Sequence, residues 1–389
     1  MISYFGAKSK MSKWIYNYIP KDIKTFAEPF SGAMWVYTTI GLDYSNIKNI
    51  IYNDYNKHMA NLFACLKEHK TFLSKIENEI ENGFLKTDKI DEEYKQFHKD
   101  IFYSYKHDKS STNFLDNPPI NIPDFDAGVK YAFLLTSTFN GVFPRSGGYS
   151  GISGNNKIKL YALINKLKKK EYQDKLSKIT NIHSLDFEEL IKKYDSKDTF
   201  FYLDPPYFSS DEDGNDTGKR ASWYGVKDSF NQQTHIRLLE LLKTTKSRWA
   251  LSYYYFPELE NHLPRDKYVW LEKDFFRSSA SFSETKDTKG TELLILNYDP
   301  KFIGNNTPTS EKLIDEIEEE NDGAFINSDI DKSEIIEEFT HKLISSQKDI
   351  EPDIQEVVND VFWDLIPEKE VEVKPVVKPE EEIDDFWNS

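Results

Sequence analysis

The clearest chemical signal in this 389-residue sequence is Asp204-Pro205-Pro206-Tyr207, which directly follows the apolar run Phe200–Leu203. The prolines fix φ and lack N–H donors, so the turn is rigid and its carbonyls can face outward as acceptors. Asp204 and the Pro205 carbonyl would together accept both hydrogens of an exocyclic amino group on a nucleobase, which frees the nitrogen lone pair for attack. Tyr207 would stack on that base, worth about 1–3 kcal/mol. The alternative is a proline turn that ends a strand, with Asp204 as a cap, because short motifs also occur by chance.

Three other segments offer groups that suit the same ligand site. Glu28-Pro29-Phe30-Ser31-Gly32 precedes an expected helix, and Gly32 permits close approach of a ligand to the backbone. Asp54 ends an expected strand, where dinucleotide folds bind ribose hydroxyls, although an N-cap for the following helix explains it equally well. Tyr4 and Lys8 would add an aromatic ring and a cation, unless they belong to a solvated terminus.

The pattern of residues 1–300 places these segments at the ends of strands. Short β-rich runs alternate with longer helical patterns, which is typical of βαβ units and a mostly parallel sheet. Ligands bind such sheets outside the carboxyl ends of the strands. Apolar residues at helical spacing predict helices within 56–81 and 232–242. We expect strands at 25–27, 49–52, 179–182, 200–203, 249–252, 268–271 and 293–296.

A long segment separates the second and third expected strands and contains glycines 147, 148, 151 and 154. The economical explanation is an inserted domain over residues 88–178. The predicted organisation is therefore a first part of the α/β domain at 1–87, the insertion, a second part at 179–300, and a tail at 301–389.

The charge of the sequence is concentrated in this tail. The whole chain carries −16, and the residues after Pro300 hold 8 Lys, no Arg and 26 acidic residues, or −18. Residues 1–300 are therefore close to neutral at +2, which does not argue against binding of a polyanion. Two amphipathic patterns, at 335–343 and 357–365, favour a partly helical tail that docks a protein partner, and a disordered solubilising extension is an equal alternative.

Composition excludes several classes of protein. Hydrophobic residues make up 38% of the chain and no apolar run approaches the ~18 residues of a membrane span, so a membrane protein is not expected. No secretory signal is visible, and we expect a cytoplasmic protein. The single cysteine, Cys65, lies in an apolar helical pattern and is predicted to be a buried, inert thiol. Neither Cys nor His spacing matches a zinc site, so no metal is expected.

Taken together, these motifs resemble the Dam-like (alpha-type) family of site-specific DNA adenine N6 methyltransferases, in which they occur in the same order. Tyr4, Gly6 and Lys8 are similar to its N-terminal segment, 28–32 to its Glu-Pro-Phe-x-Gly loop, and Asn53-Asp54 to its Asn-Asp pair. Asp186-Phe187 is similar to its Asp-Phe before a helix. The four residues Asp204–Tyr207, called the tetrad below, match its catalytic motif completely. The resemblance covers nearly all of residues 1–300 and none of the tail. Met34 departs from it, since a small residue is frequent there.

The resemblance implies a fold, a cofactor and a reaction. The fold would be Rossmann-like, a mostly parallel sheet with one antiparallel strand at 293–296, plus an inserted, mainly helical target-recognition domain. The reaction would be methylation of adenine N6 in double-stranded DNA, with the base flipped into the Asp204–Tyr207 pocket. The implied contacts to S-adenosylmethionine are Tyr4, Lys8, Glu28, Ser31, Gly32, Asp54, Asp186, Phe187 and Asp204.

The implied DNA contacts lie in the insertion. Phe139-Asn140-Gly141 with Arg145 resembles the entry to the family's recognition region, and Lys157 and Lys159 would lie near phosphates, positioning DNA without specifying its sequence. A solvated helix face explains the lysines equally well. Two alternatives to the whole assignment stay open: an amino methyltransferase acting on cytosine N4 or on RNA, and an inactive nucleic-acid-binding scaffold.

Overall fold

A computed structural model of the chain describes residues 8–42, 45–81, 90–107, 114–144, 147–152, 158–209, 211, 215–224, 230–276 and 289–300. The chain divides after Thr307 into two units. All described residues belong to the first, so the predicted amphipathic helices and docking role of the tail lie outside the described part of the chain.

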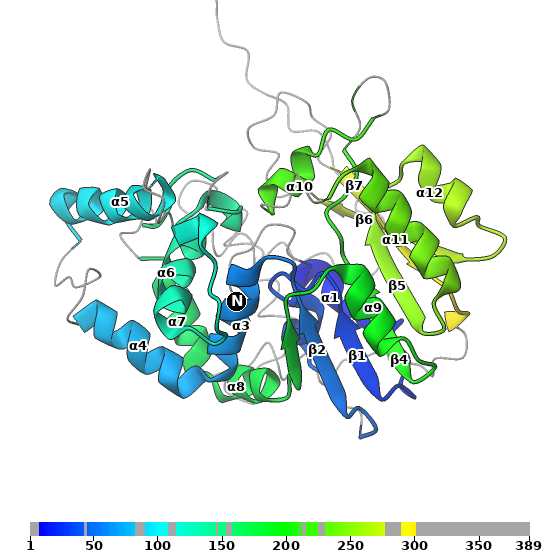
Figure 1. Ribbon diagram of the computed structural model, residues 1–389, viewed down its shortest axis with the longest axis horizontal. Coiled ribbons are helices and arrows are strands. Elements are labelled where there is room, and N and C mark those ends of the chain that lie inside the picture. The colour runs from blue at the N-terminus through cyan, green and yellow to red at the C-terminus, as the bar shows by residue number, and fades with distance from the viewer. Residues whose placement is uncertain are drawn as a thin grey trace, which may run out of the picture. The chain divides into compact units, whose positions relative to one another are not determined.

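Within this part, helices and seven strands alternate as the sequence predicts (Figure 1). The strands are β1 (Thr25–Glu28), β2 (Asn49–Asn53), β3 (Asn181–His183), β4 (Thr199–Leu203), β5 (Arg248–Tyr253), β6 (Val269–Phe276) and β7 (Lys289–Leu296). The α-helices are α1 (Ser9–Tyr16), α2 (Trp35–Ile40), α3 (Lys57–Lys67), α4 (His69–Glu81), α5 (Glu92–His107), α6 (Phe125–Thr136), α7 (Leu160–Lys168), α8 (Lys170–Ser177), α9 (Phe187–Tyr194), α10 (Lys219–Trp223), α11 (Gln232–Thr244) and α12 (Pro257–His262). Two 3₁₀ turns, η1 (Phe114–Asp116) and η2 (Phe139–Gly141), complete the described elements.

The strands form one sheet in the order β3-β2-β1-β4-β5-β7-β6. Neighbouring strands from β3 through β5 are parallel, whereas β7 runs antiparallel to both β5 and β6. The mostly parallel sheet and its antiparallel strand are therefore confirmed. The expected strand at 179–182 begins later, at Asn181, and Thr180 just before it donates to Ile50 O through both its backbone N–H and its hydroxyl.

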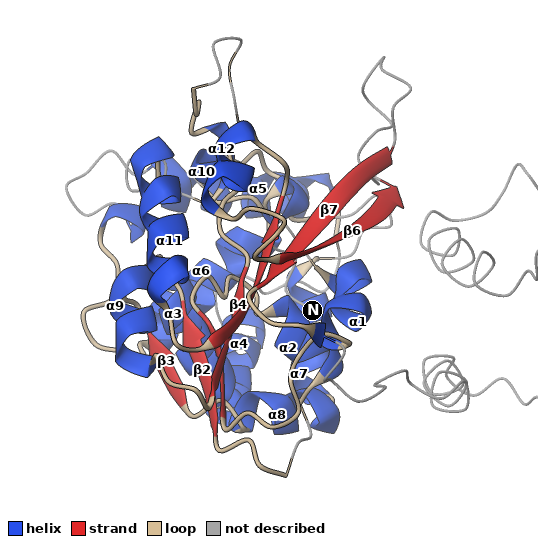
Figure 2. Ribbon diagram, turned by 90° about the vertical axis from the view of Figure 1, so that its right-hand side faces the viewer, coloured by secondary structure: helices blue, strands red, loops and turns tan. Residues whose placement is uncertain are grey.

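Strand geometry explains why these runs are apolar at every position. Successive side chains point to opposite faces, and both faces of this sheet are covered by helices. In β4, Phe200 and Tyr202 pack into one apolar cluster with α1, α2, α3 and α6, while Phe201 and Leu203 pack into a second cluster with α9 and α11. Figure 2 shows α9 and α11 on one side of the strands and α1 and α2 on the other. The result is three layers, helices–sheet–helices.

The helical pattern predicted over 56–81 is confirmed as two helices, α3 and α4, that meet at Glu68. Cys65 on α3 is fully buried and unpaired, as predicted, and burial raises the pKa of its thiol to about 12. Its sulfur lies against Gly128 of α6, where a Cβ would come within 2.7 Å of Sγ. A glycine at this position therefore lets α3 and α6 approach closely.

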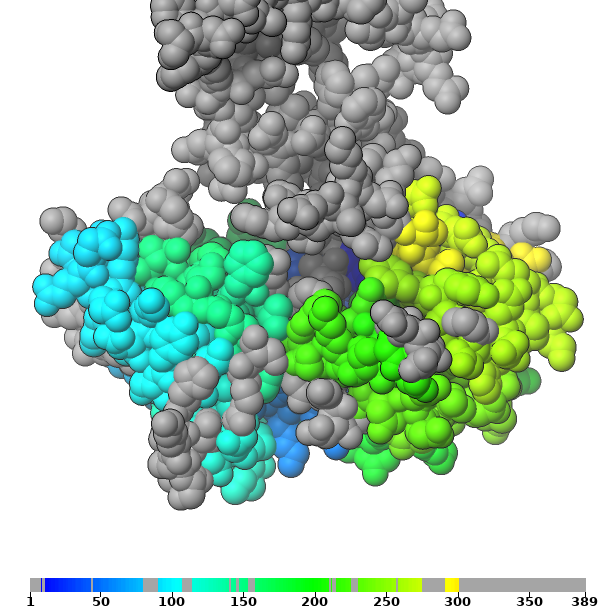
Figure 3. Space-filling model, turned by 90° about the horizontal axis from the view of Figure 1, so that it is seen from above, coloured from blue at the N-terminus to red at the C-terminus, as the bar shows by residue number. Residues whose placement is uncertain are grey.

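The described residues between 90 and 177 are mainly helical, and their helices share a core with the sheet. Phe102 of α5, Leu134 of α6 and Leu163 of α7 belong to the same apolar cluster as Phe26 and Ile50 of the strands. The boundaries at 88 and 178 stay a prediction. In the view of Figure 3, residues 90–144 (cyan to blue-green) lie on one side and residues 230–276 (yellow-green) on the other. Among the described helices, none is long and apolar enough to cross a membrane.

The glycine-rich segment packs on this helical region. Tyr149 pairs with Thr138, and Ile152 pairs with Ile158 in isolated antiparallel bridges. A Cβ built on Gly151 would meet His98 Cε1 at 2.6 Å and Ser137 Oγ at 2.7 Å, whereas one on the exposed Gly148 would meet no heavy atom within 4 Å. Gly151 is therefore required for close packing, and Gly148 is not.

This difference gives a test of the packing. We expect Gly151→Ala to lower the free energy of unfolding by about 1–3 kcal/mol, because His98 and Ser137 must move away from the new methyl group. Gly148→Ala, the matched control three residues earlier, should change it by less than about 0.5 kcal/mol. Urea denaturation of both variants measures the difference, and equal stabilities would show that the packing around Gly151 is loose.

Candidate active site

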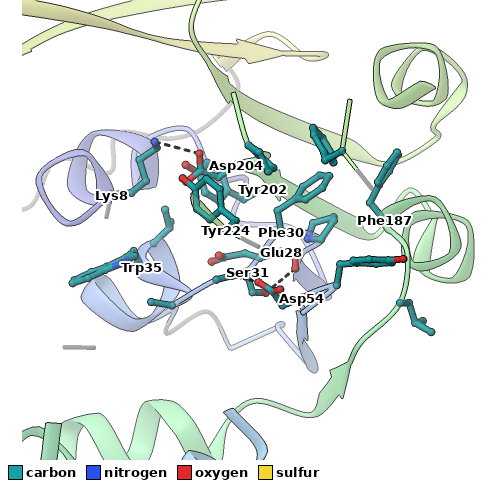
Figure 4. Close-up of a pocket in the computed structure, with 18 of the residues that line it drawn as sticks. Lys8, Glu28, Phe30, Ser31, Trp35, Asp54, Phe187, Tyr202, Asp204 and Tyr224 are labelled. Atoms are coloured by element: carbon teal, nitrogen blue, oxygen red, sulfur yellow. Dashed lines mark hydrogen bonds and ion pairs between the residues drawn. The ribbon is translucent and has the colours of Figure 1, made fainter. Parts of the chain in front are cut away.

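A cavity of about 300 Å³ opens beyond the carboxyl ends of β1, β2 and β4, where the sequence predicted a ligand site (Figure 4). Each described residue predicted to contact the cofactor lines it. Of the tetrad, Asp204 and Pro206 line the cavity, and Pro205 and Tyr207 do not. The lining consists of Lys8, Glu28, Pro29, Phe30, Ser31, Gly32, Ala33, Trp35, Val36, Asp54, Tyr55, Leu185, Asp186, Phe187, Tyr202, Asp204, Pro206, Tyr224, Phe230 and Thr234.

The loops of this edge are joined by the fully buried side chain of Asn53, the last residue of β2. Its amide nitrogen donates to the carbonyls of Pro29 at 2.8 Å and Leu185 at 3.1 Å, and its amide oxygen accepts from Leu185 N at 2.9 Å. The Asn53 backbone N–H also donates to Ser31 Oγ at 3.0 Å. One amide thus fixes the loops after β1 and β3 against the end of β2. Ser31, predicted as a cofactor contact, is held by this network through its own hydroxyl, which donates to Glu28 O.

Asp54 faces the cavity as an acceptor. Its Oδ2 accepts from Gly32 N at 2.9 Å and its Oδ1 from Asn56 N at 2.8 Å. The N-cap of α3 is Asn56, whose side chain accepts from His58 N, so the capping explanation for Asp54 is wrong. Burial raises the pKa of Asp54 to about 6, although the two backbone N–H donors lower it.

The turn between β1 and α2 has an unusual backbone. Gly32 and Met34 both have φ of +49°, and Met34 is fully buried in a left-handed conformation that costs a non-glycine residue about 1–3 kcal/mol. Glu28 connects the two ends of this turn, since its Oε1 accepts a hydrogen bond of 3.3 Å from Tyr37 N in the first turn of α2. Burial raises the pKa of Glu28 well above its usual value, with the negative charge of Asp204 adding to the effect.

Aromatic rings form part of the cavity wall. Phe30 lies 5.4 Å from Phe187 and 5.7 Å from Phe230 between ring centroids. Asp186 begins α9, as predicted, because its Oδ1 accepts from Glu188 N at 2.9 Å. Its Oδ2 pairs with Arg237 at 2.8 Å, so both carboxylate oxygens of Asp186 already have protein partners.

The tetrad is joined to two charged residues from distant parts of the sequence. Lys8 Nζ lies 3.2 Å from Asp204 Oδ1 and 3.2 Å from Glu292 Oε1 on β7. The Tyr207 hydroxyl lies 2.9 Å from Asp204 Oδ1 and also contacts Glu292 Oε1. Burial alone lowers the pKa of Lys8, but the two carboxylates outweigh it and raise that pKa above its usual value. Burial also raises the pKa of both Asp204 and Glu292, opposed in each case by Lys8.

Tyr207 is buried among other rings. Its ring stacks on Tyr253 with centroids 5.1 Å apart, meets Tyr254 edge-on at 4.6 Å, and has the Lys8 ammonium 4.7 Å from its centroid. Its stacking on a base therefore stays a prediction, and what the structure shows is a hydroxyl that bridges two carboxylates.

Several predicted DNA contacts lie outside the described part of the chain: Arg145, Lys157 and the side chain of Asn140, as does the predicted cofactor contact Tyr4. Lys159 is described, and its Nζ donates to Ser150 Oγ at 2.8 Å. Glu292 was missed by sequence reasoning, which treated its segment only as a scaffold strand. The available signal was a charged residue directly before the apolar run 293–296. In the described ranges, no group of three or more His, Cys, Asp or Glu could hold a metal ion.

The sheet order, its antiparallel β7 and the cavity at the carboxyl edge are consistent with an α/β methyltransferase fold. The family model for D12 class N6 adenine-specific DNA methyltransferases matches residues 4–284, nearly three quarters of the sequence. The chain belongs to this family and is a DNA adenine methyltransferase.

The chain is also similar to several curated methyltransferases, at low sequence identity. The chain is 24% identical over 251 residues to the type II methyltransferase M.CviBI of Paramecium bursaria Chlorella virus NC1A, covering 64% of this chain and 80% of that protein. It is 26% identical over 321 residues to the modification methylase StsI of Streptococcus sanguinis, covering 77% of this chain but only 43% of that protein. It is 24% identical over 311 residues to the type II methyltransferase M.MjaIII of Methanocaldococcus jannaschii, covering 76% of this chain and 98% of that protein.

The network around Asn53 can be tested by truncation. Asn53→Ala removes three side-chain hydrogen bonds and leaves buried partners on Pro29 and Leu185 unpaired, so the free energy of unfolding should fall by about 3 kcal/mol. Asn49→Ala, at the start of the same strand, removes one partly exposed bond to Thr25 Oγ1 and should cost less than about 1 kcal/mol. Equal losses in urea denaturation would show that Asn53 does not organise this edge.

Proposed function

We propose that the chain transfers the methyl group of S-adenosylmethionine to the N6 amino group of an adenine that is turned out of double-stranded DNA. The observation that carries the proposal is the position of Asp204. Its carboxylate lines the same cavity as Asp54 and Glu28, and Lys8 and Tyr207 hold it by one oxygen, Oδ1. These two donors leave Oδ2 as the acceptor for a substrate amine.

The cavity suits this cofactor in its donor set. Asp54 presents a carboxylate to ligand hydroxyl groups, and the Phe30, Phe187 and Phe230 rings offer an apolar wall to an adenine ring. The acidic lining favours a positively charged ligand. When bound, S-adenosylmethionine supplies a methyl group on a positively charged sulfur. The other predicted contacts, Lys8, Glu28, Ser31, Gly32 and Asp186, lie around the same space.

The chain's own residues would act on the target base. Asp204 and the Pro205 carbonyl accept the two N6 hydrogens, which localises the nitrogen lone pair, and Pro206 keeps the turn rigid. Turning the base out costs a few kcal/mol, offset by these bonds and by stacking on Tyr207. Most of the acceleration then comes from positioning and from fixed charges around the reacting amine.

We propose that residues 88–178 recognise DNA, with Asn140, Arg145, Lys157 and Lys159 among the contacts. Support comes from a backbone hydrogen bond of 2.7 Å from Phe143 N, just after η2, to Trp223 O at the end of α10. This bond joins the predicted recognition segment to the helix that follows the tetrad. Arg220 of the same helix lies 4.6 Å from the Tyr254 ring centroid and 5.9 Å from that of Tyr207.

Motif order supports a place in the Dam-like (alpha-type) group, because the Gly32 loop precedes the helical region and the tetrad follows it. The names of the relatives support a role in DNA modification within a restriction–modification system. We further propose that the acidic segment 301–389 docks a protein partner, on the charge and amphipathic patterns of its sequence.

The role of Asp204 predicts a selective loss of chemistry. Asp204→Asn should lower single-turnover methylation by about 10²–10³-fold, because a charged acceptor at the reacting amine is lost, while DNA affinity stays within threefold. Asp198→Asn, an exposed aspartate at the opposite end of β4 that pairs with Lys24, should leave methylation unchanged. Mass spectrometry of nucleosides from methylated DNA measures the rate and identifies the base. Methylcytosine as the product, or full activity of Asp204→Asn, would overturn the proposal.

Asp54 predicts a pH dependence of cofactor binding. Its raised pKa of about 6 means that the charged acceptor is present above pH 6 and is lost as the pH falls below it. Affinity for S-adenosylmethionine should therefore fall by about tenfold between pH 7 and pH 5. Calorimetry measures this change, and Asp54→Asn should bind weakly without a step near pH 6. A step that persists in Asp54→Asn would assign the titration to another group.

A further inference from the structure

The reaction described above uses Asp204 and leaves a second buried carboxylate, Glu292, without a role. Glu292 lies on β7, 88 positions beyond Asp204 in the sequence, and its side chain is 3% exposed. Alternation along β7 places it on the same face as Leu294, the face that α1 and α2 cover. A buried carboxylate needs partners, because an unpaired charge in an apolar interior is very unfavourable.

The partners of Glu292 are the same two groups that hold Asp204. Lys8 Nζ lies 3.2 Å from Glu292 Oε1 and 3.2 Å from Asp204 Oδ1. The Tyr207 hydroxyl contacts Glu292 Oε1 and lies 2.9 Å from Asp204 Oδ1. Lys8 and Tyr207 therefore each bridge the two carboxylates, and the four side chains form a closed cycle. The hydroxyl has one proton to donate, so Asp204 and Glu292 compete for it.

This competition determines how much negative charge stays on Asp204. With both carboxylates ionised, one ammonium balances two negative charges, and the cycle carries a net charge of −1. If Glu292 were neutral, Lys8 and Asp204 would form an ordinary one-to-one ion pair, and Tyr207 would donate fully to Asp204. Asp204 would then be a weaker acceptor for an amine on which positive charge develops during methyl transfer.

We propose that Glu292 is a positioning residue that draws Lys8 and Tyr207 away from Asp204 and so keeps the Asp204 carboxylate available to the N6 amino group. The inference rests on the function proposed above for Asp204. It assigns Glu292 no contact with substrate or cofactor. Its effect reaches the reaction through the charge of Asp204.

Other titratable groups face this cycle, and they do not account for the expected change. Burial raises the pKa values of the nearby tyrosines, so these stay protonated in acid, and Lys8 stays charged. Glu28 is the third carboxylate that interacts with Asp204, and it is the same in every variant compared below. Among the described residues, the groups that face the cycle from outside it are Glu28, Tyr202, Arg220, Tyr224 and Tyr254.

The test compares three variants of the full chain by single-turnover methylation of DNA across pH 5–8. Glu292→Gln keeps the size of the side chain and removes its charge. Glu292→Asp keeps the charge. The matched control is Glu272→Gln on β6, an exposed glutamate that pairs in register with Leu293 and bonds only Arg265 among the described contacts given for its side chain. Calorimetry with S-adenosylmethionine and a DNA-binding assay accompany each rate.

We expect Glu292→Gln to reduce the plateau rate by about tenfold or more while cofactor and DNA affinities stay within threefold. Removing a neighbouring negative charge stabilises the ionised form of Asp204, so the acid limb of the pH–rate profile should move to lower pH. Glu292→Asp should keep the limb close to its original position, and Glu272→Gln should leave both rate and limb unchanged.

A fall in rate with an unmoved limb would show a merely structural role, and an unchanged rate would show none, so either result overturns the inference. If Glu292→Gln does not fold, Tyr207→Phe provides the second measurement. Loss of the hydroxyl donor should move the limb to higher pH, opposite to the shift expected for Glu292→Gln, and an unmoved limb would again refute the cycle. These failures differ from that of the proposed function, in which the unaltered chain would form no N6-methyladenine at all.

Discussion

The rest of the site depends on the hydrogen bonds made by the side-chain amide of Asn53. A parallel sheet brings the ends of its strands to one edge, but it does not fix the loops that leave them. Asn53 does so here, since three of its hydrogen bonds reach the loops after β1 and β3. Gly32 can then donate to Asp54, and Phe187 can pack against Phe30 at the wall of the cavity. The cavity-lining groups at this edge are therefore held in place by a backbone geometry that one buried amide maintains.

The two faces of the sheet support different parts of the molecule. The cluster that contains α9 and α11 also holds Tyr207 and Tyr253, and so supports the tetrad from one side. The cluster that contains α1–α3 extends into α5–α8 without a break, so the helical region is built on the same core as the first strands. Recognition and chemistry, as proposed, would thus be connected through the packed elements of this shared core.

The sequence predicted the elements better than the contacts between them. Strands such as β4 were recognisable because burial on both faces makes every position apolar. The ends of those strands indicated Asp54 and Asp204, whereas Asp186 came from the family resemblance, and all three line the cavity. Glu292 could not be assigned because its partners, Lys8 and Tyr207, are far away in the chain, and only the three-dimensional fold shows that they meet. For the same reason the sequence predicted a role for the ring of Tyr207 and none for its hydroxyl. The position of a residue along a strand can be predicted from the neighbouring residues, whereas the sharing of one ammonium by two distant carboxylates cannot.

Lys8 stands at the N-cap of α1, and its ammonium lies between two buried carboxylates. Loss of this side chain would take away a counter-ion and leave Asp204 and Glu292 facing each other. Among the described residues, no member of the two apolar clusters precedes Met11 of α1, and Lys8 belongs to neither cluster. The ammonium of Lys8 therefore serves the charge balance of the site, and the apolar core that folds the sheet is built without it.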